Sequence, residues 1–506
     1  MSGARPPLLA LALDAVDAPL ALGWAREGRL PVLGGLLDNG ALVRLRTLGH
    51  LFPESLWPTI ISGDSLARHG LYNWRVVPAG EYTLRSVHTA TARPIWRLLR
   101  EHDPGARAVL VDIPYTEPGG DNGVVELIGW GQRGATLDAS WPPELLDDVR
   151  RRHGRYPPGA HTHFHRRSLA QRHVLRTLER WAEVRTRLVA ELLREAPWSF
   201  CMACYSEPHN AGHEFHRYLE PGTWGHERRR ARGAEDGLLR VYQAVDRGVG
   251  RLIAAAGERV NVVAFSGMGM RSCSSGDRLL KRVLVGLGYE VPAAGQPTRL
   301  RPLATLQSRV PWSLRRLLHL RLSQEAREDL QERLWLGATD WSRSRAFGER
   351  EPGIGLVHIN VRGRDPQGIV EPGAPYRALC EEIARELGEL REVESGEPAV
   401  TEVLHRDELV EGADGEELPD LIVRFAQERL LAAVRHTRLG VVRENVRDVP
   451  YSEHTGEGFA VAAGPGIRSG VSLEAELEPL APTLLALMGV PVPETMPSGP
   501  LSAMLR

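Results

Sequence analysis

Short apolar runs alternate with amphipathic helical stretches along much of this chain, and no other feature of the sequence restricts its fold as strongly. Helical patterns such as LERWAEVRTRLVAELLREA and LLRVYQAVDRGVGRLIAAAG separate several of the runs. Uninterrupted apolar runs of this length are typical of strands buried on both faces. Their alternation with helices predicts a doubly wound α/β fold with a mostly parallel central sheet and helices on both faces. The runs occupy residues 7–14, 106–114, 198–207, 260–267, 421–425 and 458–466.

Polar residues follow several of these runs directly. Asp14, Glu207, Ser266 and Gly267 stand at or just past the ends of three predicted strands. In doubly wound sheets, ligands bind outside the carboxyl ends of the strands. The sequence therefore predicts a ligand site built partly from these positions.

The domain organisation follows from the length and from two segments that interrupt the alternation. A chain of 506 residues can hold two or three average domains, but large α/β enzymes also reach this size as one elaborated domain. We expect a single domain over residues 1–506, with insertions at 134–185 and 300–345. The first segment is rich in Pro, His and Arg. The second contains an amphipathic helical stretch, for which packing or dimer contacts are the expected role.

Composition and charge exclude several functional classes. The formal net charge of −1 gives no reason to expect nucleic acid or an anionic membrane as a partner, and no segment has the long uncharged run that spans a bilayer. The four cysteines are too few for a disulfide framework, which favours a reducing cytoplasm. Cys201 and Cys204 have CxxC spacing but lie within the apolar run WSFCMACY, so we expect them to pack in the core. The sequence indicates no oligomeric state.

The stretch SEPHNAGHEFH contains the strongest chemical signal. His209 and His213 are four residues apart, about one helical turn, so both side chains can face one point. An isolated pair of this kind is more often a solvated helix face, but this pair directly follows a predicted strand. A zinc site needs three or four ligands. His454, in the Gly-rich turn SEHTGEG before another predicted strand, is the candidate for the third, and three imidazoles would hold one Zn²⁺ as a Lewis acid.

Seven segments in one order resemble the type I phosphodiesterase/nucleotide pyrophosphatase branch of the alkaline phosphatase superfamily. The resemblance implies an alkaline-phosphatase-like α/β fold. It also implies cleavage of phosphate or sulfate esters by two zinc ions and a Thr or Ser nucleophile. The segments are LALDAVDAP, SLWPTIISGDSLARHGLYNW, SEPHNAGHEFH, VVAFSGMGM, INVRGRDPQGIVEPGAPY, LPDLIVRF and SEHTGEGFAVAAGPGI.

The resemblance implies that the first metal site of the family is intact here. His213 and His454 hold the places of its two histidines, and His209 stands where an acid is usual. Glu207 would then orient a ligand histidine rather than bind the metal itself. The expected cofactor is zinc, held by three imidazoles.

The second metal site of the family is degenerate in this chain. Asp14 keeps its place, but Gly267 and Met268 stand where the family has an Asp and a His. Neither replaces a hard anionic ligand, because glycine has no side chain and thioether sulfur is soft. We therefore expect about one zinc per chain, with Asp14 as a further metal ligand or as a general base.

The family's nucleophile is also missing at its usual spacing, where Pro53 stands. Ser55, Thr59 and Ser62 are the nearby hydroxyls, and Ser55 in the PESLW turn is the best substitute. A structural role is the simpler interpretation of any one of them. Without the usual nucleophile, direct transfer to a second substrate is as consistent with the sequence as hydrolysis.

Two functional hypotheses remain open. The first is a metal-dependent hydrolase or transferase that acts on a small-molecule phosphate- or sulfate-type ester through a single zinc site, with Asp14 or Ser55 as catalytic groups. The second is a catalytically degenerate member of the superfamily that binds a ligand or a protein partner. The loss of one half-site favours the second hypothesis. The grouping of three histidines with Asp14 favours the first.

Overall fold

The computed structural model describes most of the chain, and its contacts divide the chain into two compact units. Unit 1 comprises Met1–Trp74, Val87–Cys273 and Asp448–Arg506, and unit 2 comprises Arg75–Ser86 and Ser274–Arg447. The described residues are 5–131, 138–157, 168–219, 235–272, 276–293, 336, 339–351, 353–410, 418–426, 430–444 and 452–506.

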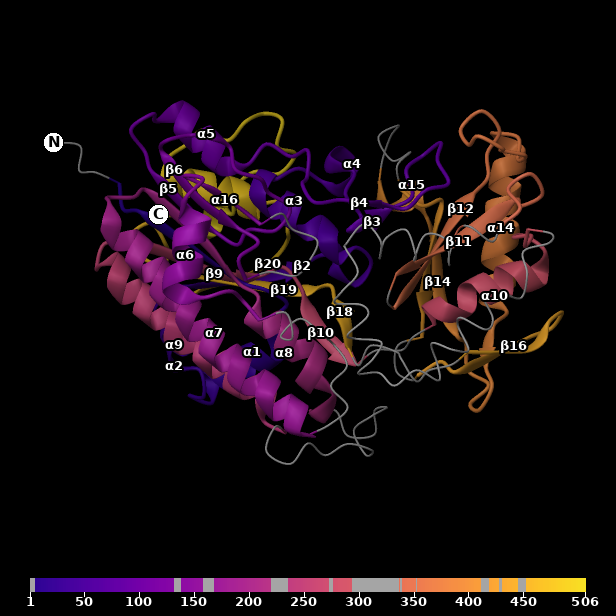
Figure 1. The fold of residues 1–506 in the computed structure, drawn as a ribbon, viewed down its shortest axis with the longest axis horizontal. Helices are drawn as coiled ribbons and strands as arrows, with labels where there is room; N and C mark the ends of the chain where they lie inside the picture. Colours follow the sequence, from indigo (N-terminus) through magenta and orange to yellow (C-terminus); the bar gives the residue numbers. More distant parts are fainter. Residues whose placement is uncertain are drawn as a thin grey trace. The chain divides into compact units, whose positions relative to one another are not determined.

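A nine-stranded sheet forms the centre of unit 1 (Figure 1). Its strands lie in the order β20-β2-β19-β9-β1-β8-β5-β6-β7, and all neighbours are parallel except those that pair with β19 or β7. The predicted mostly parallel sheet is therefore confirmed. The strands are β1 (Leu8–Leu13), β2 (Ala41–Arg46), β5 (Ala108–Val111), β6 (Val124–Ile128), β7 (Ala139–Trp141), β8 (Phe200–Tyr205), β9 (Asn261–Ser266), β19 (Glu457–Ala463) and β20 (Val471–Glu476).

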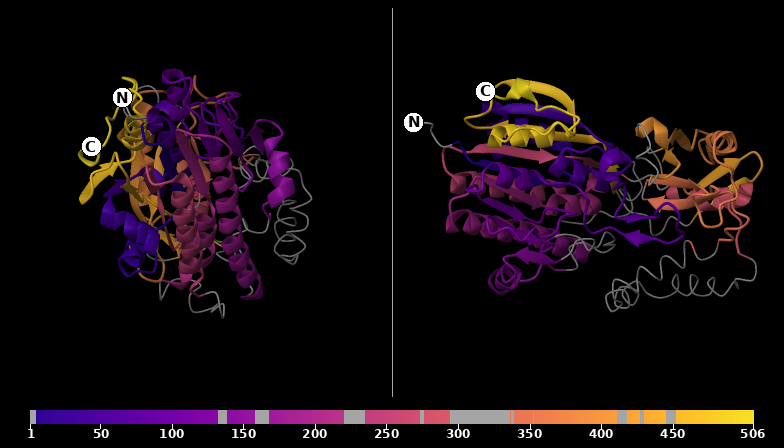
Figure 2. Two further views of the ribbon diagram at one scale, coloured as in Figure 1. Left: turned by 90° about the vertical axis from the view of Figure 1, so that its left-hand side faces the viewer. Right: turned by 90° about the horizontal axis from the view of Figure 1, so that it is seen from above.

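Side chains of the central strands alternate between two hydrophobic clusters. Along β1, the odd-numbered residues from Leu9 to Leu13 join one cluster, and the even-numbered residues from Leu8 to Ala12 join the other. Because successive side chains of a strand point to opposite faces, this run needs helices on both sides of the sheet, and Figure 2 shows both layers. One cluster contains residues of α1 (Ala18–Arg26), α2 (Pro31–Asn39), α6 (Leu145–His153), α7 (Ser168–Glu195) and α9 (Gly237–Ala256). The other contains residues of α3 (Leu56–Ser62), α5 (Ile95–His102) and α16 (Leu480–Met488).

The CxxC pair lies in this core. Cys201 and Cys204 are free, fully buried, and assigned to different clusters, so their thiols face opposite sides of β8. Burial raises the pKa of both thiols. This arrangement agrees with the expected packing role.

The predicted insertions are described only in part. α7 overlaps the range 134–185 and supplies Leu175 and Leu178 to the core of unit 1, so this part of the range is a layer of the main fold. Residues 158–167 and 294–335 lie outside the described residues. The single domain with two insertions stays a prediction.

Unit 2 is built around an antiparallel sheet in the order β11-β12-β15-β14. The run 421–425, predicted as part of the main sheet, forms β15 here instead. Its residues are almost all buried, so its apolar pattern is that of a covered strand and does not indicate which sheet it joins. The elements of unit 2 include β3 (Arg75–Val76), β4 (Arg85–Ser86), α10 (Asp277–Leu287), β11 (Ala346–Glu351), β12 (Ile354–Ile359), α14 (Ala374–Gly388), β13 (Arg391–Glu392), β14 (Val400–His405), α15 (Arg406–Leu409), β15 (Leu421–Phe425), β16 (Ala433–His436) and β17 (Gly440–Arg443).

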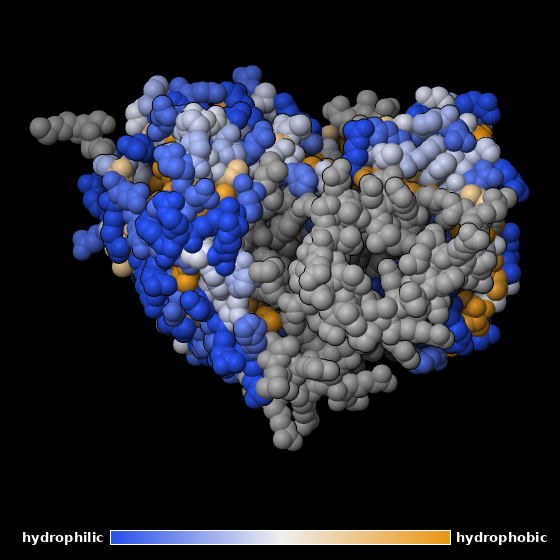
Figure 3. Space-filling model, viewed as in Figure 1, coloured by the Kyte–Doolittle hydropathy of each residue, from blue (hydrophilic) through white to orange (hydrophobic). Residues whose placement is uncertain are grey.

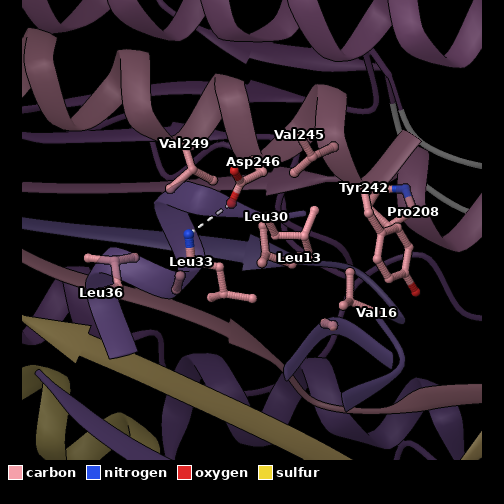
Figure 4. Close-up of a pocket in the computed structure, with 12 residues that line it drawn as sticks. Leu13, Val16, Leu30, Leu33, Leu36, Pro208, Tyr242, Val245, Asp246 and Val249 are labelled. Carbon is pink, nitrogen blue, oxygen red and sulfur yellow. Dashed lines mark hydrogen bonds between the residues drawn. The ribbon is translucent and has the colours of Figure 1, made fainter. Parts of the chain in front are cut away.

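An apolar cavity lies between β1, α2 and α9 in unit 1 (Figure 4). Asp246 on α9 borders it and accepts hydrogen bonds from the backbone N–H groups of Val32 and Leu33, at 3.1 and 2.8 Å. The carboxylate thereby caps the start of α2, where Leu30 offers no side-chain cap. None of the histidines of the metal motif lines this cavity, so we assign it to packing.

Within the part of the chain that the structure describes, no helix is both long and apolar enough to cross a membrane. Figure 3 shows mostly hydrophilic side chains on the visible surface of both units. Val441 is the one exposed large hydrophobic residue in the described ranges.

Candidate metal centre

The helix α8 (Glu207–Phe215) follows β8 after a single connecting residue, Ser206. Pro208 stands in its first turn, where the N–H that proline lacks would have no helical partner in any case. One turn of this helix then brings His209 and His213 together, with their Nε2 atoms 2.9 Å apart. The two side chains therefore point to the same place, as their i, i+4 spacing predicts.

His454 reaches the same point from another part of unit 1. It lies on β18 (Ser452–Thr455), which pairs antiparallel with β10 (Gly269–Ser272). β18 precedes β19, and β19 is antiparallel to β9, so the start of β19 lies at the edge where the parallel strands end. Met270 lies opposite His454 in this ribbon, and a Cβ on Gly212 of α8 would be 2.8 Å from Met270 Cγ. The bare backbone at Gly212 therefore lets the ribbon approach α8.

The three imidazoles form one compact group. The ligand nitrogens of His209, His213 and His454 all lie within 4.8 Å of one another. The ring centroids are separated by 4.8 to 5.2 Å. Among the described residues, this is the one cluster of histidine, cysteine and carboxylate side chains with metal-ligand spacing.

Hydrogen bonds behind the rings favour one assignment of the ring protons. Asp14 Oδ2 is 2.8 Å from His209 Nδ1, and an ionised carboxylate only accepts, so Nδ1 donates. Ser452 Oγ donates to Gly212 O and lies 3.2 Å from His213 Nδ1, which therefore donates to the hydroxyl. Both Nε2 atoms then present lone pairs to each other. That arrangement requires a proton or a metal ion between them, and neutral imidazoles suit zinc, so these residues fit the expected ion.

Asp14 is the first residue after β1 and is held by a strained turn. Ala15, which follows it, has φ = 51°, a left-handed conformation that residues other than glycine rarely adopt. The backbone N–H of Val16 then donates to Ser266 Oγ at 3.0 Å, which ties the turn to the end of β9. The turn places Asp14 against His209, as the sheet-edge argument predicts. Its roles as metal ligand and as general base stay predictions.

The place beside Asp14 that the resemblance assigns to a second metal has mostly apolar walls. Ser266 supplies the other polar side chain of this small cavity, and its hydroxyl donates to Met268 O at 2.8 Å. A Cβ on Gly267 would lie 3.3 Å from Ile60 Cδ1, so even a small side chain is crowded there. The cavity is lined by Ala12, Leu13, Asp14, Leu56, Trp57, Ile60, Phe265, Ser266, Gly267 and Met268.

Ser55 ends a short 3₁₀ turn directly before α3. Its side chain is buried, and its Oγ donates to Phe52 O at 2.7 Å. The next residue, Leu56, lines the small cavity described above, whereas Ser55 does not. The hydroxyls of Thr59 and Ser62 are also engaged in hydrogen bonds in this region. The catalytic role of Ser55 stays a prediction.

A buried ionic cluster beside α8 has no recognisable sequence signal. Arg185 on α7 is fully buried together with Asp112 and Glu207. Burial alone would lower the pKa of Arg185, but the two carboxylates hold it above its usual range. Burial raises the pKa of both carboxyl groups, and Arg185 opposes that rise. Glu207 thus pairs with Arg185, where the sequence led us to expect a ligand histidine as its partner.

A second aspartate–histidine contact also joins the β1–α1 loop to the segment that carries His209 and His213. His216, just after α8, is buried, and its Nε2 is 3.6 Å from Asp17 Oδ2. Asp17 also caps α1 by accepting from Leu20 N at 2.8 Å. Asp14 thus contacts His209, and Asp17 contacts His216. The sequence contains both pairs, but only the structure shows which aspartate meets which histidine.

A mostly parallel α/β sheet with three histidines gathered at the carboxyl edge of its strands is the arrangement expected for an alkaline-phosphatase-like protein. The model of the type I phosphodiesterase / nucleotide pyrophosphatase family matches residues 8–438, and the chain belongs to this family. The predicted superfamily and the prediction of an enzyme are thereby confirmed.

Solved structures show the same fold at low sequence identity. Murine ectonucleotide pyrophosphatase / phosphodiesterase 5 is 12% identical with a TM-score of 0.52, and the match covers 99% of this chain and 100% of that chain. Phosphonoacetate hydrolase from Sinorhizobium meliloti 1021, in complex with phosphonoacetate, is 14% identical with a TM-score of 0.54 and 96% coverage of each chain. An inactive variant of the murine protein has been solved in complex with AMP. No curated protein sequence matches the chain significantly.

Proposed function

We propose that this enzyme acts on a small-molecule phosphate- or sulfate-type ester through a single zinc ion held by His209, His213 and His454. The observation that carries the proposal is the approach of the His209 and His213 Nε2 atoms to 2.9 Å beside a third imidazole. The apolar walls next to Asp14 support one metal rather than the family's two. The AMP and phosphonoacetate bound by similarly folded proteins support a small phosphorus-containing substrate.

The residues around the three ligands orient them. A zinc ion in this position would polarise an oxygen of the transferred group. Asp14 accepts a hydrogen bond from His209 Nδ1, and Ser452 Oγ accepts one from His213 Nδ1. Each ring therefore keeps one orientation and leaves its Nε2 as the nitrogen that can bind a metal ion. The buried ligand His213 is also shielded from solvent, which strengthens electrostatic contacts at the site.

The attacking group in this proposal comes from outside the protein. The buried Ser55 hydroxyl donates a hydrogen bond to Phe52 O, and Leu56 occupies the wall next to Asp14. Water or the alcohol of a second substrate then attacks phosphorus or sulfur directly and loses its proton to the general base. The bond from phosphorus or sulfur to the ester oxygen breaks, and the departing oxygen takes a proton from solvent water. Asp14 is the general base for this attack, if its second oxygen takes the proton. A cytoplasmic location completes the proposal, in line with the free, buried Cys201 and Cys204.

Asp14→Asn tests the orienting role. The amide carries no charge and supports the His209 tautomer less strongly, so we expect zinc affinity to fall by about 10- to 100-fold, as for other partners of metal ligands. Competition with a chromophoric chelator measures the change. Asp38→Asn on α2, at an exposed position, is the matched control. Unchanged zinc affinity with lost activity would instead assign Asp14 to proton transfer alone.

Ser55→Ala tests the absence of a covalent intermediate. We expect the variant to keep its activity, because the hydroxyl serves a local turn. On a substrate that is chiral at phosphorus, one direct displacement inverts the configuration, whereas two successive displacements through a serine retain it. Retention, together with loss of activity in Ser55→Ala, would contradict direct transfer and make Ser55 the nucleophile.

The apolar half-site also favours a second candidate, a family member that binds its ligand without turning it over. A panel of aryl phosphate mono- and diesters and aryl sulfates, assayed with and without added zinc, separates the two. Zinc-dependent turnover of any ester supports the enzyme. Zinc binding with no turnover across the panel, including reactions with added acceptor alcohols, favours the binding protein.

A further inference from the structure

The guanidinium group of Arg185 forms hydrogen bonds at the start of α8. Arg185 Nε is 3.2 Å from each carboxylate oxygen of Glu207, and Nη2 is 3.1 Å from Oε1. Nη2 also lies 3.3 Å from Ser206 Oγ. Ser206 is the residue before α8 and Glu207 is its first residue, so Arg185 contacts the turn that leads to His209.

The same guanidinium contacts two strand ends of the central sheet. Nη1 pairs with Asp112, the residue that follows β5, and Nη2 donates to Gly131 O, just after β6, at 3.1 Å. Asp112 also accepts from the backbone N–H of Gly131 at 3.0 Å, and Ser206 Oγ donates to Gly131 O at 2.6 Å. One side chain thus connects β5, β6 and α8 at a point with no solvent contact.

Stability alone is a weak reason for such a cluster. Burial of one cation with two carboxylates removes three ions from water, and well-packed apolar residues of similar volume are often neutral or stabilising replacements. The conformation is also strained, since Asp112 has φ = 55°. Arginine differs from lysine in the fixed planar fork of its donors, which sets direction as well as charge. The cluster therefore fits a need for exact placement of the elements that it joins.

We propose that Arg185 is a positioning residue of the metal centre. By fixing the first turn of α8 against the ends of β5 and β6, it sets where His209 and His213 stand relative to His454. This inference rests on the proposed function, because it requires that the three histidines bind a cation.

Two variants disturb the guanidinium contacts of Arg185 in different ways. Arg185→Lys keeps the positive charge but loses the planar set of donors. Gly131→Ala keeps every charge, but its Cβ would lie 2.2 Å from Arg185 Nη2 and so displaces the guanidinium. For both variants we expect zinc affinity to fall by about 10- to 100-fold. We also expect the visible absorption spectrum of the cobalt-substituted protein to change, because that spectrum reports the geometry of the ligands.

Arg240→Lys is the control. Arg240 on α9 pairs with Glu179 of α7 at 2.9 and 3.0 Å, an ion pair that includes no residue of α8. This variant should keep wild-type zinc affinity and the wild-type cobalt spectrum. Equal losses in control and test variants would overturn the inference, as would wild-type affinity and spectrum in both test variants. If Arg185→Lys does not fold, Gly131→Ala decides. If the wild-type protein itself binds no zinc, the proposed function fails rather than the role of Arg185.

Discussion

His213→Ala is expected to lose its zinc and, with it, its activity on esters. Catalytic zinc sites keep three protein ligands, and this change leaves two. It also frees Ser452 from its contact with the ring and removes one of the two lone pairs that face each other beside His454. Elemental analysis of purified protein should fall from about one zinc per chain to a trace.

His102→Ala is the matched control for this prediction, because His102 is an exposed histidine at the end of α5. It should keep its zinc and its activity. Two metals per wild-type chain would show that residues outside the predicted set complete a second site. No metal in the wild-type protein would contradict the metalloenzyme and favour a binding protein.

The double variant Gly267→Asp with Met268→His should fail to bind a second metal and should be strongly destabilised. It restores the residue types that the family uses, but a Cβ at residue 267 would lie 3.3 Å from Ile60 Cδ1 and 3.4 Å from Leu56 Cδ1, so the new carboxylate starts from a crowded apolar wall. An unpaired charge buried in apolar surroundings lowers the free energy of unfolding by about 3–5 kcal/mol. Chemical denaturation measures that loss, and elemental analysis counts the metals.

Gly267→Ala with Met268→Leu is the comparison for this variant. It adds a side chain at residue 267 and removes the thioether, but it introduces no charge, so we expect a much smaller loss of stability. A double variant with Asp and His that stays as stable as wild type and holds two metals would show that the half-site adapts easily. The proposed direct transfer would then lose one of its supports.

The convergence of Asp14 with the three histidines was predictable from their places beside predicted strands. Asp14 follows β1, His209 lies in the first turn after β8 with His213 one helical turn further on, and His454 precedes β19. The role of Arg185 was not. It lies inside a 28-residue helix among many other arginines, and nothing local distinguishes it. Its proposed role comes from four partners that are distant in the sequence or on another element, Asp112, Gly131, Ser206 and Glu207. Such contacts are defined only by the folded chain.

The place of β15 was unpredictable for a different reason. LIVRF has the composition of a covered strand, and a covered strand has the same pattern in a parallel sheet of unit 1 as in the antiparallel sheet of unit 2. Pairing partners decide between the two, and they lie far away in the sequence. Ser55 and Leu56 are neighbours in the sequence, yet only Leu56 lines the small cavity beside Asp14. The path of the 3₁₀ turn decides this, and the sequence does not show that path.

The late position of β19 in the chain has a consequence for synthesis. β19 is the strand that joins β2 to β9, although β2 is made near the start of translation. Ser452 and His213, which lie side by side in the finished protein, are 239 positions apart. A nascent chain that already contains His209 and His213 therefore still lacks the strand that connects β2 to β9. It also lacks His454, the third imidazole of the cluster. Such long-range pairing forms slowly, so the proposed zinc site would become complete only after β18 and β19 have been made.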